Sequence, residues 1–380
     1  MFQIVDDRGH PTLPVLSATQ NQGMIYRDDS GRYIGHDESN EIGYKRVLPG
    51  DFVVHLRSFQ GGFAHSQYEG ITSPAYTVFR AKEPTSHSDR FWKHWFMSEH
   101  FIAGLSTVTY GIRDGRSISV DEFMNTFLAF PAVEEQAAIS RLFDYLDDLI
   151  TLHQRKYDKL VVFKKSMLEK MFPKDGESVP EIRFAGFTDP WEQRKLGDVA
   201  SSFDYGLNAA ATEYDGQNKY LRITDIDDET HEFSKSDLTT PLADLAMSAD
   251  YLLKEGDLLF ARTGASVGKT YLYRQFDGMV YFAGFLIRAR IGEGADPEFA
   301  YQATLTDAYK KYVAITSQRS GQPGVNAQEY ADYQLMLPSK TEQQQIGMTL
   351  RSLDDLITLH QRKLELLQNI KKSLLDKMFA

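Results

Sequence analysis

Two glycine-containing segments hold the side chains best suited to chemistry in this sequence. Residues 262–270 read Arg-Thr-Gly-Ala-Ser-Val-Gly-Lys-Thr, which is close to a phosphate-binding loop. Such a loop needs four residues between its first glycine and the Gly-Lys pair, whereas three separate Gly264 from Gly268. A strand-like Tyr-Leu-Tyr follows, and not a helix whose N-terminus could hold phosphate. We therefore predict a hairpin loop and no nucleotide site.

The second segment, residues 317–326, reads Ser-Gln-Arg-Ser-Gly-Gln-Pro-Gly-Val-Asn. Gln, Arg, Ser and Asn are side chains that pair with base edges in DNA, and glycine lets a backbone come close. Arg and Lys in the first segment could donate to phosphate or guanine. Ordinary surface loops are the alternative for both segments. The candidate DNA contacts here are Arg262, Thr263, Lys269, Gln318, Arg319, Ser320, Gln322 and Asn326.

The first third of the chain contains counterparts of both segments. Residues 57–62, Arg-Ser-Phe-Gln-Gly-Gly, stand where the counterpart of the first segment belongs. Residues 110–117, Tyr-Gly-Ile-Arg-Asp-Gly-Arg-Ser, stand in the place of the second. They add the candidate DNA contacts Arg57, Ser58, Gln60, Arg113 and Arg116.

Catalytic and metal sites find little support in the sequence. The absence of Cys excludes disulfides and thiolate ligands. Asp189-Pro190-Trp191 is not the Asn/Asp-Pro-Pro-aromatic motif of an amino-methyltransferase, and no nuclease-like cluster of carboxylates and lysine is recognisable. His153 and His360 have no second ligand at metal spacing, so we interpret both as core histidines with partners inside a packed structure. We predict no catalytic residue, no metal and no cofactor.

An internal repeat identifies the elements that position these segments. LDDLITLHQRK occurs at 146–156 and again at 353–363, an offset of 207. Stepping alternately by four and three residues along each copy gives an apolar seam, the period of a coiled coil, which a His and a Lys interrupt in both copies. We predict long helices over 134–172 and 338–380 that pack antiparallel on each other. Two helices that each pack on their own domain are the alternative.

The paired acids of the repeat lie off the seam. Asp147-Asp148 and Asp354-Asp355 are interpreted as helix-surface carboxylates. Catalysis by them would need a pocket, so a face for docking a partner is the better functional hypothesis.

The segments outside the predicted helices have the composition of globular domains. Residues 173–190 are rich in Pro, Gly and charged residues, which indicates a linker. Residues 1–133 and 191–337 have the patterns of two mixed α/β (α+β) domains. We predict strands at 52–56, 75–79, 220–223, 257–261, 270–274 and 285–289, and helices at about 89–104 and 297–314.

The net charge of −11 argues against simple binding to nucleic acid, which needs Lys and Arg to neutralise phosphate. Residues 191–337 alone contain 14 basic and 22 acidic residues. Any contact with DNA must therefore come from local clusters or from basic partners. The sequence has no apolar run of membrane-spanning length and no signal peptide at its start, so we expect a cytoplasmic protein without membrane contact.

The repeat and the joint between its copies resemble the specificity subunit of type I restriction–modification systems. The resemblance rests on Pro-x-x-x-Glu-Gln-x-x-Ile before LDDLITLHQRK, on KKSMLEKMFP, on EIRFAGFTDPWEQRKLGDVA and on the strand Gly256–Phe260. It implies two target-recognition domains, each reading half of a bipartite double-stranded DNA target, separated by an antiparallel coiled coil with pseudo-twofold symmetry. It also implies two methyltransferase (modification) subunits and ATP-dependent restriction subunits as partners, which would bind S-adenosylmethionine and ATP.

The first domain departs from this pattern at its start. Leu16-Ser17 aligns with Ile223-Thr224 at the repeat offset, which places the counterpart of Trp191 before residue 1. We therefore expect this domain to lack an edge strand or opening helix and to be less stable than the second. Three alternatives stay open: a catalytic component of the same system, a truncated, inactive or recombination-donor copy, and a coiled-coil scaffold without a role on DNA.

Overall fold

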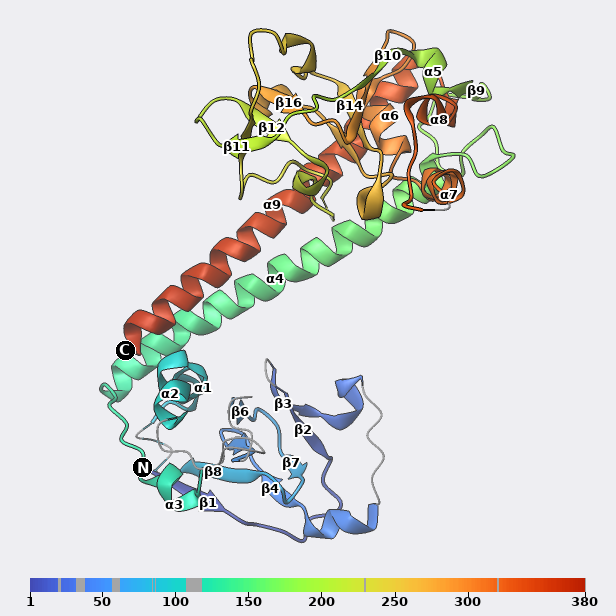
Figure 1. Cartoon of the computed structure of the whole chain (residues 1–380). Helices are drawn as coiled ribbons and strands as arrows, with labels where there is room; N and C mark the ends of the chain where they lie inside the picture. Colours follow the sequence, from blue (N-terminus) through green and yellow to red (C-terminus); the bar gives the residue numbers. More distant parts are fainter. Residues whose placement is uncertain are drawn as a thin grey trace. The chain divides into compact units, whose positions relative to one another are not determined.

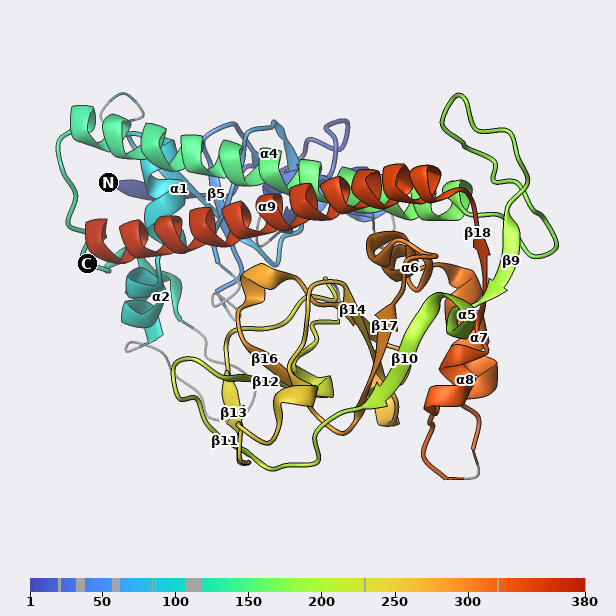
Figure 2. The ribbon, with the colours of Figure 1, turned by 90° about the horizontal axis from the view of Figure 1, so that it is seen from above.

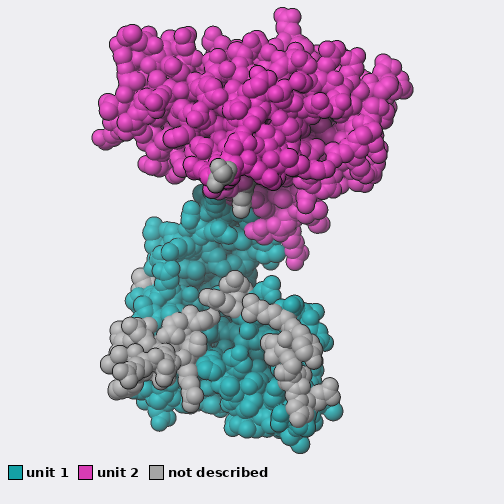
Figure 3. Space-filling model, turned by 45° about the vertical axis from the view of Figure 1, so that its right-hand side comes forward, with its two compact units in different colours: residues 1–153, 363–380 teal, residues 154–362 magenta. Residues whose placement is uncertain are grey.

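A computed structural model of the chain contains two compact units, coloured separately in Figure 3. Unit 1 comprises residues 1–153 and 363–380, and unit 2 comprises residues 154–362. Within the described residues, no helix is both long and apolar enough to span a membrane. The structure describes all residues except 20–21, 32–37, 57–61, 84, 86, 107–117, 229, 320 and 380.

Two long helices, α4 (Val133–Met171) and α9 (Lys340–Met378), contribute to both units. Their bounds lie within two residues of the predicted ones. The first part of α4 belongs to unit 1 together with the last part of α9, and the opposite ends of both helices belong to unit 2. The two helices therefore run antiparallel where they meet in each unit, as predicted, and Figures 1 and 2 both draw them side by side.

Ion pairs explain the lysines that interrupt the seam. In unit 1, Lys371 on α9 contacts Asp147 on α4, and in unit 2, Lys164 on α4 contacts Asp354 on α9. Each pair is the repeat counterpart of the other, with the roles of the helices exchanged. Asp147 and Asp354 are thus engaged in ion pairs between the two helices and are half-buried, whereas their sequence neighbours at 148 and 355 are exposed; the docking role of these aspartates stays a prediction.

Unit 1 is built on a four-stranded antiparallel sheet in the order β1-β8-β5-β6. Two further strand pairs, β2-β3 and β4-β7, lie beside it. The core is strongly aromatic, and Phe52, Phe79 and Trp92 in it are fully buried. The elements are β1 (Phe2–Val5), β2 (Leu16–Thr19), β3 (Gly23–Tyr26), β4 (Lys45–Val47), β5 (Phe52–Val54), β6 (Ala64–His65), β7 (Gly70–Thr72), β8 (Thr77–Ala81), α1 (Asp89–Met97), α2 (Glu99–Ser106) and α3 (Val120–Met124).

Unit 2 has a four-stranded antiparallel sheet in the order β10-β17-β14-β15. The pairs β11-β13, β12-β16 and β18-β9 complete its strands. Its elements are β9 (Glu192–Lys195), α5 (Leu196–Val199), β10 (Ala200–Tyr205), β11 (Ala211–Glu213), β12 (Lys219–Leu221), β13 (Thr239–Pro241), β14 (Asp257–Ala261), β15 (Thr270–Leu272), β16 (Val280–Phe282), β17 (Leu286–Ile291), α6 (Pro297–Ala303), α7 (Asp307–Thr316), α8 (Ala327–Ala331) and β18 (Gln334–Leu337).

The two sheets share a plan that the domain sequences do not reveal. A buried aspartate precedes or opens the matching strands β5 and β14, Asp51 in unit 1 and Asp257 in unit 2. Each carboxylate accepts a hydrogen bond from the backbone N–H three residues earlier. Each also pairs with an arginine of the neighbouring strand, Arg80 at 2.8 Å and Arg290 at 3.2 Å from their Nε atoms. The duplication therefore includes the heads as well as the helices.

Both predicted head helices are divided in two by a hydroxyl side chain. Ser98 separates α1 from α2, and its Oγ accepts a hydrogen bond from the N–H of Phe101. Thr306 precedes α7, and its Oγ1 accepts one from the N–H of Tyr309. A hydroxyl at such a position satisfies N–H groups that a helix start leaves without partners, so each Ser or Thr begins a new helix.

The Gln of the repeated Glu-Gln pair holds each long helix against its head. In unit 1 the Gln136 amide donates to a proline carbonyl and accepts from the N–H of Ser88, the residue before α1. In unit 2 the Gln343 amide makes the same two bonds, with Asp296 before α6 as the donor. The presence of this Gln in both copies of the repeat thus has a structural cause.

The linker contains no helix or strand at 173–190, as its composition predicts, but it is anchored. Arg183 donates to both carboxylate oxygens of Glu342 at 2.7 and 2.8 Å, and to the carbonyl of Asp189. The Glu342 side chain is fully buried, so this ion pair fixes the linker to the start of α9.

Of the edge strand or opening helix expected to be missing from the first domain, the edge strand is present in the main sheet, where β1 pairs with β8 as β10 pairs with β17. The units differ elsewhere: β9 and α5 precede β10 in unit 2, and β9 pairs with β18. In the described part of unit 1, residues 127–130, which precede α4 as β18 precedes α9, form no strand.

Candidate nucleic-acid interface

Residues 262–270 form the loop of a β-hairpin, as predicted. The flanking strands β14 and β15 are antiparallel, and the N–H of Gly268 donates to the carbonyl of Ala261 at 3.0 Å. Gly264 and Gly268 have φ angles of 72° and 85°, in the region that favours glycine. A Cβ on Gly268 would also lie 2.6 Å from the side chain of Val313. The glycines therefore serve the turn and its packing.

The second predicted segment lies beside this hairpin loop. Thr263 and Gly324 form an antiparallel bridge. The N–H of Val325 donates to the carbonyl of Arg262 at 2.9 Å, and the N–H of Gly264 donates to a carbonyl at position 323 at 3.0 Å. Two segments about sixty residues apart in the sequence thus form one edge of unit 2.

Two exposed aromatic residues, missed by the sequence analysis, complete this edge. Tyr205 ends β10, Phe285 precedes β17 and Arg262 follows β14, three strands that Figure 2 shows next to one another. The Arg262 guanidinium lies 5.0 Å from the centroid of the Tyr205 ring, and the Arg262 N–H donates to the carbonyl of Phe285. The rings of Tyr205 and Phe285 are 45% and 57% exposed. We call Tyr205, Arg262, Thr263 and Phe285 the sheet-edge cluster.

Arg262 differs from most arginines of the sheet in having no carboxylate partner among the described residues. Arg288 pairs with Asp204 at 2.8 Å, and Arg290 pairs with Asp257 at 3.2 Å. Internal ion pairs therefore neutralise much of the basic charge of this acidic domain. A cation that an aromatic ring holds at the surface is available to an external anion.

Other predicted contacts have internal roles. The Arg319 guanidinium donates to the carbonyls of Thr316 and Gln318 and pairs with Glu329. The Asn326 side chain accepts a hydrogen bond from the N–H of Glu329 at 2.9 Å and caps α8. The Asn-x-x-Glu spacing signals such a capping box, so the sequence contained this information.

The remaining candidates are divided between exposed and undescribed positions. Gln318 and Gln322 are exposed. Lys269 pairs with Asp228 and lines a cavity of about 770 Å³ between the head and α4, to which Arg262 does not contribute. Ser320, Arg57, Ser58, Gln60, Arg113 and Arg116 lie outside the described residues.

The two seam histidines, His153 and His360, both have interaction partners and are half-buried. Among the described residues, no three His, Cys, Asp or Glu side chains lie where they could share a metal ion.

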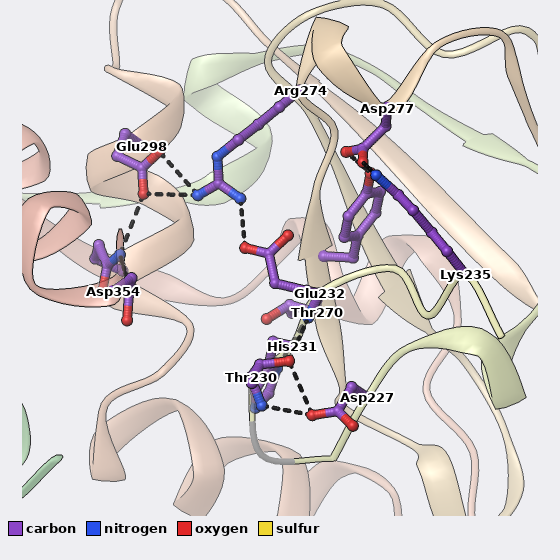
Figure 4. Close-up of polar contacts among 12 residues, drawn as sticks. Asp227, Thr230, His231, Glu232, Lys235, Thr270, Arg274, Asp277, Glu298 and Asp354 are labelled. Atoms are coloured by element: carbon purple, nitrogen blue, oxygen red, sulfur yellow. Dashed lines mark hydrogen bonds and ion pairs between the residues drawn. The ribbon is translucent and has the colours of Figure 1, made fainter. Parts of the chain in front are cut away.

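A buried polar network beneath the head connects it to α9 (Figure 4). Arg274 donates to Glu232 at 2.9 Å and to Glu298 at 3.3 Å. The Gln302 amide then joins Glu298 to Asp354 of α9, at 3.1 and 2.8 Å. Burial raises the pKa of both Glu232 and Glu298, while Arg274 opposes that shift. The network therefore fixes the head of unit 2 on the helix that belongs to it.

Comparison with known proteins identifies a protein family that this chain matches. Residues 188–369 match the family of the type I restriction modification DNA specificity domain. The type I restriction enzyme MjaVIII specificity subunit of Methanocaldococcus jannaschii is 23% identical over 272 residues, 67% of this chain. The alignment spans 61% of that relative's length.

Two solved structures are similar over the whole chain. The S subunit of a type I restriction–modification system from M. genitalium has a TM-score of 0.58 at 15% identity, with 100% of this chain and 96% of that chain covered. A chain from a study of assembly and conformational transition of the type I R-M system has a TM-score of 0.50 at 15% identity, with coverage of 100% and 97%. These likenesses establish the fold of two heads with long helices.

Proposed function

We propose that this chain, which belongs to the family of type I restriction–modification specificity subunits, reads double-stranded DNA for its complex and catalyses no reaction itself. One observation carries the proposal beyond family membership. The ends of β10 and β14 and the start of β17 bring two exposed aromatic residues to one edge of unit 2, together with an arginine that has no carboxylate partner among the described residues. Arginine, hydroxyl and apolar side chains at a sheet end are suited to contacts with phosphates and base edges.

Each member of the sheet-edge cluster has a distinct role in this proposal. The Arg262 guanidinium presents two parallel donors, which match guanine O6 and N7. The ring of Tyr205 beside it limits the orientations of the guanidinium, so less conformational entropy is lost on binding. Phe285 provides an apolar contact for a base or a thymine methyl group.

The two units would read different halves of a bipartite target. Their main sheets share a plan, yet the edges differ in chemistry. In unit 1, Asp6 follows β1 and pairs with Arg8 at 2.6 Å, and half-buried Tyr76 precedes β8. An edge at which Asp6 and Arg8 pair with each other is suited to other base edges than the arginine and aromatic rings of unit 2.

The outer faces of α4 and α9 would dock two modification subunits. Leu152 and Leu359, counterparts in the repeat, are 45% and 44% exposed. Equivalent apolar side chains on both helices provide the same docking surface twice, which suits two copies of one partner. Restriction subunits would join this complex, and the partners would bind S-adenosylmethionine and ATP.

Arg262→Ala tests the DNA-reading surface. In the complex with its modification subunit, we expect the variant to bind its target duplex about 1–3 kcal/mol more weakly, the value of a bidentate contact to guanine. Fluorescence anisotropy at fixed salt measures the change. Lys310→Ala in the same unit removes an exposed cation away from the sheet-edge cluster and should change affinity far less. Equal losses in the two variants would contradict a specific role for Arg262.

A further inference from the structure

Unit 1 exposes a strip of apolar side chains immediately before α4. Val120 and Met124 on α3 are 42% and 37% exposed, and Phe127 and Phe130 beyond it are 89% and 44% exposed. None of these side chains has a role in the proposed DNA edge. We call these four residues the apolar strip.

The repeat shows how the equivalent segment is paired in unit 2. α8 corresponds to α3, and both begin with a capping box. The segment after α8 is strand β18, which pairs antiparallel with β9. As a result Leu337, the repeat counterpart of Phe130, is only 7% exposed. Unit 2 thus shows that a second β-strand can pair with the segment that follows this short helix.

In the described part of unit 1, the backbone of residues 127–130 takes part in no strand pairing. Unpaired N–H and C=O groups beside exposed apolar side chains form a template for strand addition. We infer that residues 127–130 accept an extended β-strand from a partner polypeptide, and that this strand is apolar where it faces Phe127.

The side chains of the strip determine the chemistry of that strand. In unit 2 the Gln193 amide of β9 donates to the amide oxygen of Gln334 at 2.9 Å. Phe127 occupies the repeat position of Gln334, which stays exposed beside β9, so a polar residue of the incoming strand would lose this bond and an apolar one would pack against the exposed ring. The preferred strand therefore alternates, with apolar side chains toward Phe127.

The same comparison excludes a copy of α5 after the strand. In unit 2, Gly197 of α5 lies so close to α8 that an added Cβ would be 3.1 Å from the Cβ of Ala331. Met124 occupies the repeat position of Ala331 and is much larger, so an α5-like helix does not fit there. The site takes a strand alone.

Trp95 already fills the place of the tryptophan that precedes β9. In unit 2, Trp191 packs on Phe172 and on Phe299, with ring centroids 6.1 and 5.7 Å apart. In unit 1, Trp95 packs on Phe379 and on Phe91, at 5.3 and 6.0 Å. The incoming strand therefore needs no tryptophan before it, and in this respect it differs from β9.

A short synthetic peptide of alternating Val and Arg, with blocked ends, tests the inference on the full chain by hydrogen exchange. At a peptide concentration on the order of 1 mM, where weak complexes form, we expect amide exchange at residues 125–130 to slow at least about tenfold. A matched peptide with Gln in place of Val should have a smaller effect. Phe127→Asp should abolish the protection, and Leu242→Asp, at another exposed apolar position in unit 2, should preserve it.

Three outcomes would overturn the inference. They are an absence of protection, equal protection in the Phe127→Asp variant, and protection that rises with protein concentration without peptide, which would assign the strip to a second copy of the chain. Because Phe127 is almost fully exposed, its replacement should leave the fold intact, and exchange at β5 checks this. If Phe127→Asp alters β5, Phe127→Ser replaces it in the comparison.

Discussion

Phe379→Ala should destabilise unit 1 by about 3–5 kcal/mol, the usual cost of removing a buried aromatic ring, and leave unit 2 unchanged. Phe379 stands just beyond α9 and is 1% exposed. Its ring lies 5.5 Å from that of Phe91 and 5.6 Å from that of Phe143. The end of the chain is thus part of the core of the first head, although the sequence places it after the second.

Hydrogen exchange resolved by region measures this effect in both units at once. The matched control is Phe172→Ala, the repeat counterpart, whose ring lies 5.2 Å from that of Phe299 in unit 2. We expect each variant to accelerate exchange in its own unit. If Phe379→Ala accelerates exchange in unit 2, or changes neither unit, the assignment of the C-terminal segment to the first head is wrong.

Arg274→Met should destabilise unit 2 by about 3–5 kcal/mol at neutral pH, because it leaves two largely buried carboxylates without their cation. The Arg274 side chain is 6% exposed, and those of Glu298 and Glu232 are 12% and 34% exposed. Both carboxylates already have pKa values raised by burial. Loss of the guanidinium raises these folded-state pKa values further.

The sign of the pH dependence follows from this. A carboxyl group whose pKa is higher in the folded than in the unfolded state binds protons preferentially on folding, so stability falls as pH rises through that range. The deficit of Arg274→Met should therefore shrink between about pH 8 and about pH 5, because protonation neutralises the unpaired charges. Urea unfolding across this pH range measures the loss of stability.

The control is Arg194→Met, which removes an exposed pair with Glu192 and should cost less than about 1 kcal/mol of stability at every pH. A deficit that is independent of pH would contradict the ion-pair explanation.

Local periodicity allowed the long helices to be predicted almost to the residue. Seam positions such as Phe143 and Leu350 are fully buried, as a coiled-coil pattern requires. The strand at 257–261 was also predicted with its correct bounds, because a continuous apolar run followed a glycine turn. Breaks within the head helices were missed, although Ser98 and Thr306 are typical N-cap residues.

Features that depend on strand pairing could not be predicted from the sequence. Tyr205 and Phe285 are isolated aromatic residues, and only the order β10-β17-β14 brings them to Arg262. The Arg274 network draws on four separate parts of the chain, and no local pattern indicates it. The shared plan of the heads was hidden because few side chains, such as Asp51 and Asp257, retain the same role.

Mapping of methylated bases tests the central claim most directly. The chain would be co-expressed with its modification subunit in a host without methylation of its own, as the native protein and as Arg262→Ala. We predict that the native chain directs methylation to one motif of two specified blocks separated by unspecified bases. The variant should lose or relax only the block read by unit 2. Methylation that does not depend on the chain, or a motif that Arg262→Ala leaves unchanged in both blocks, would contradict the account.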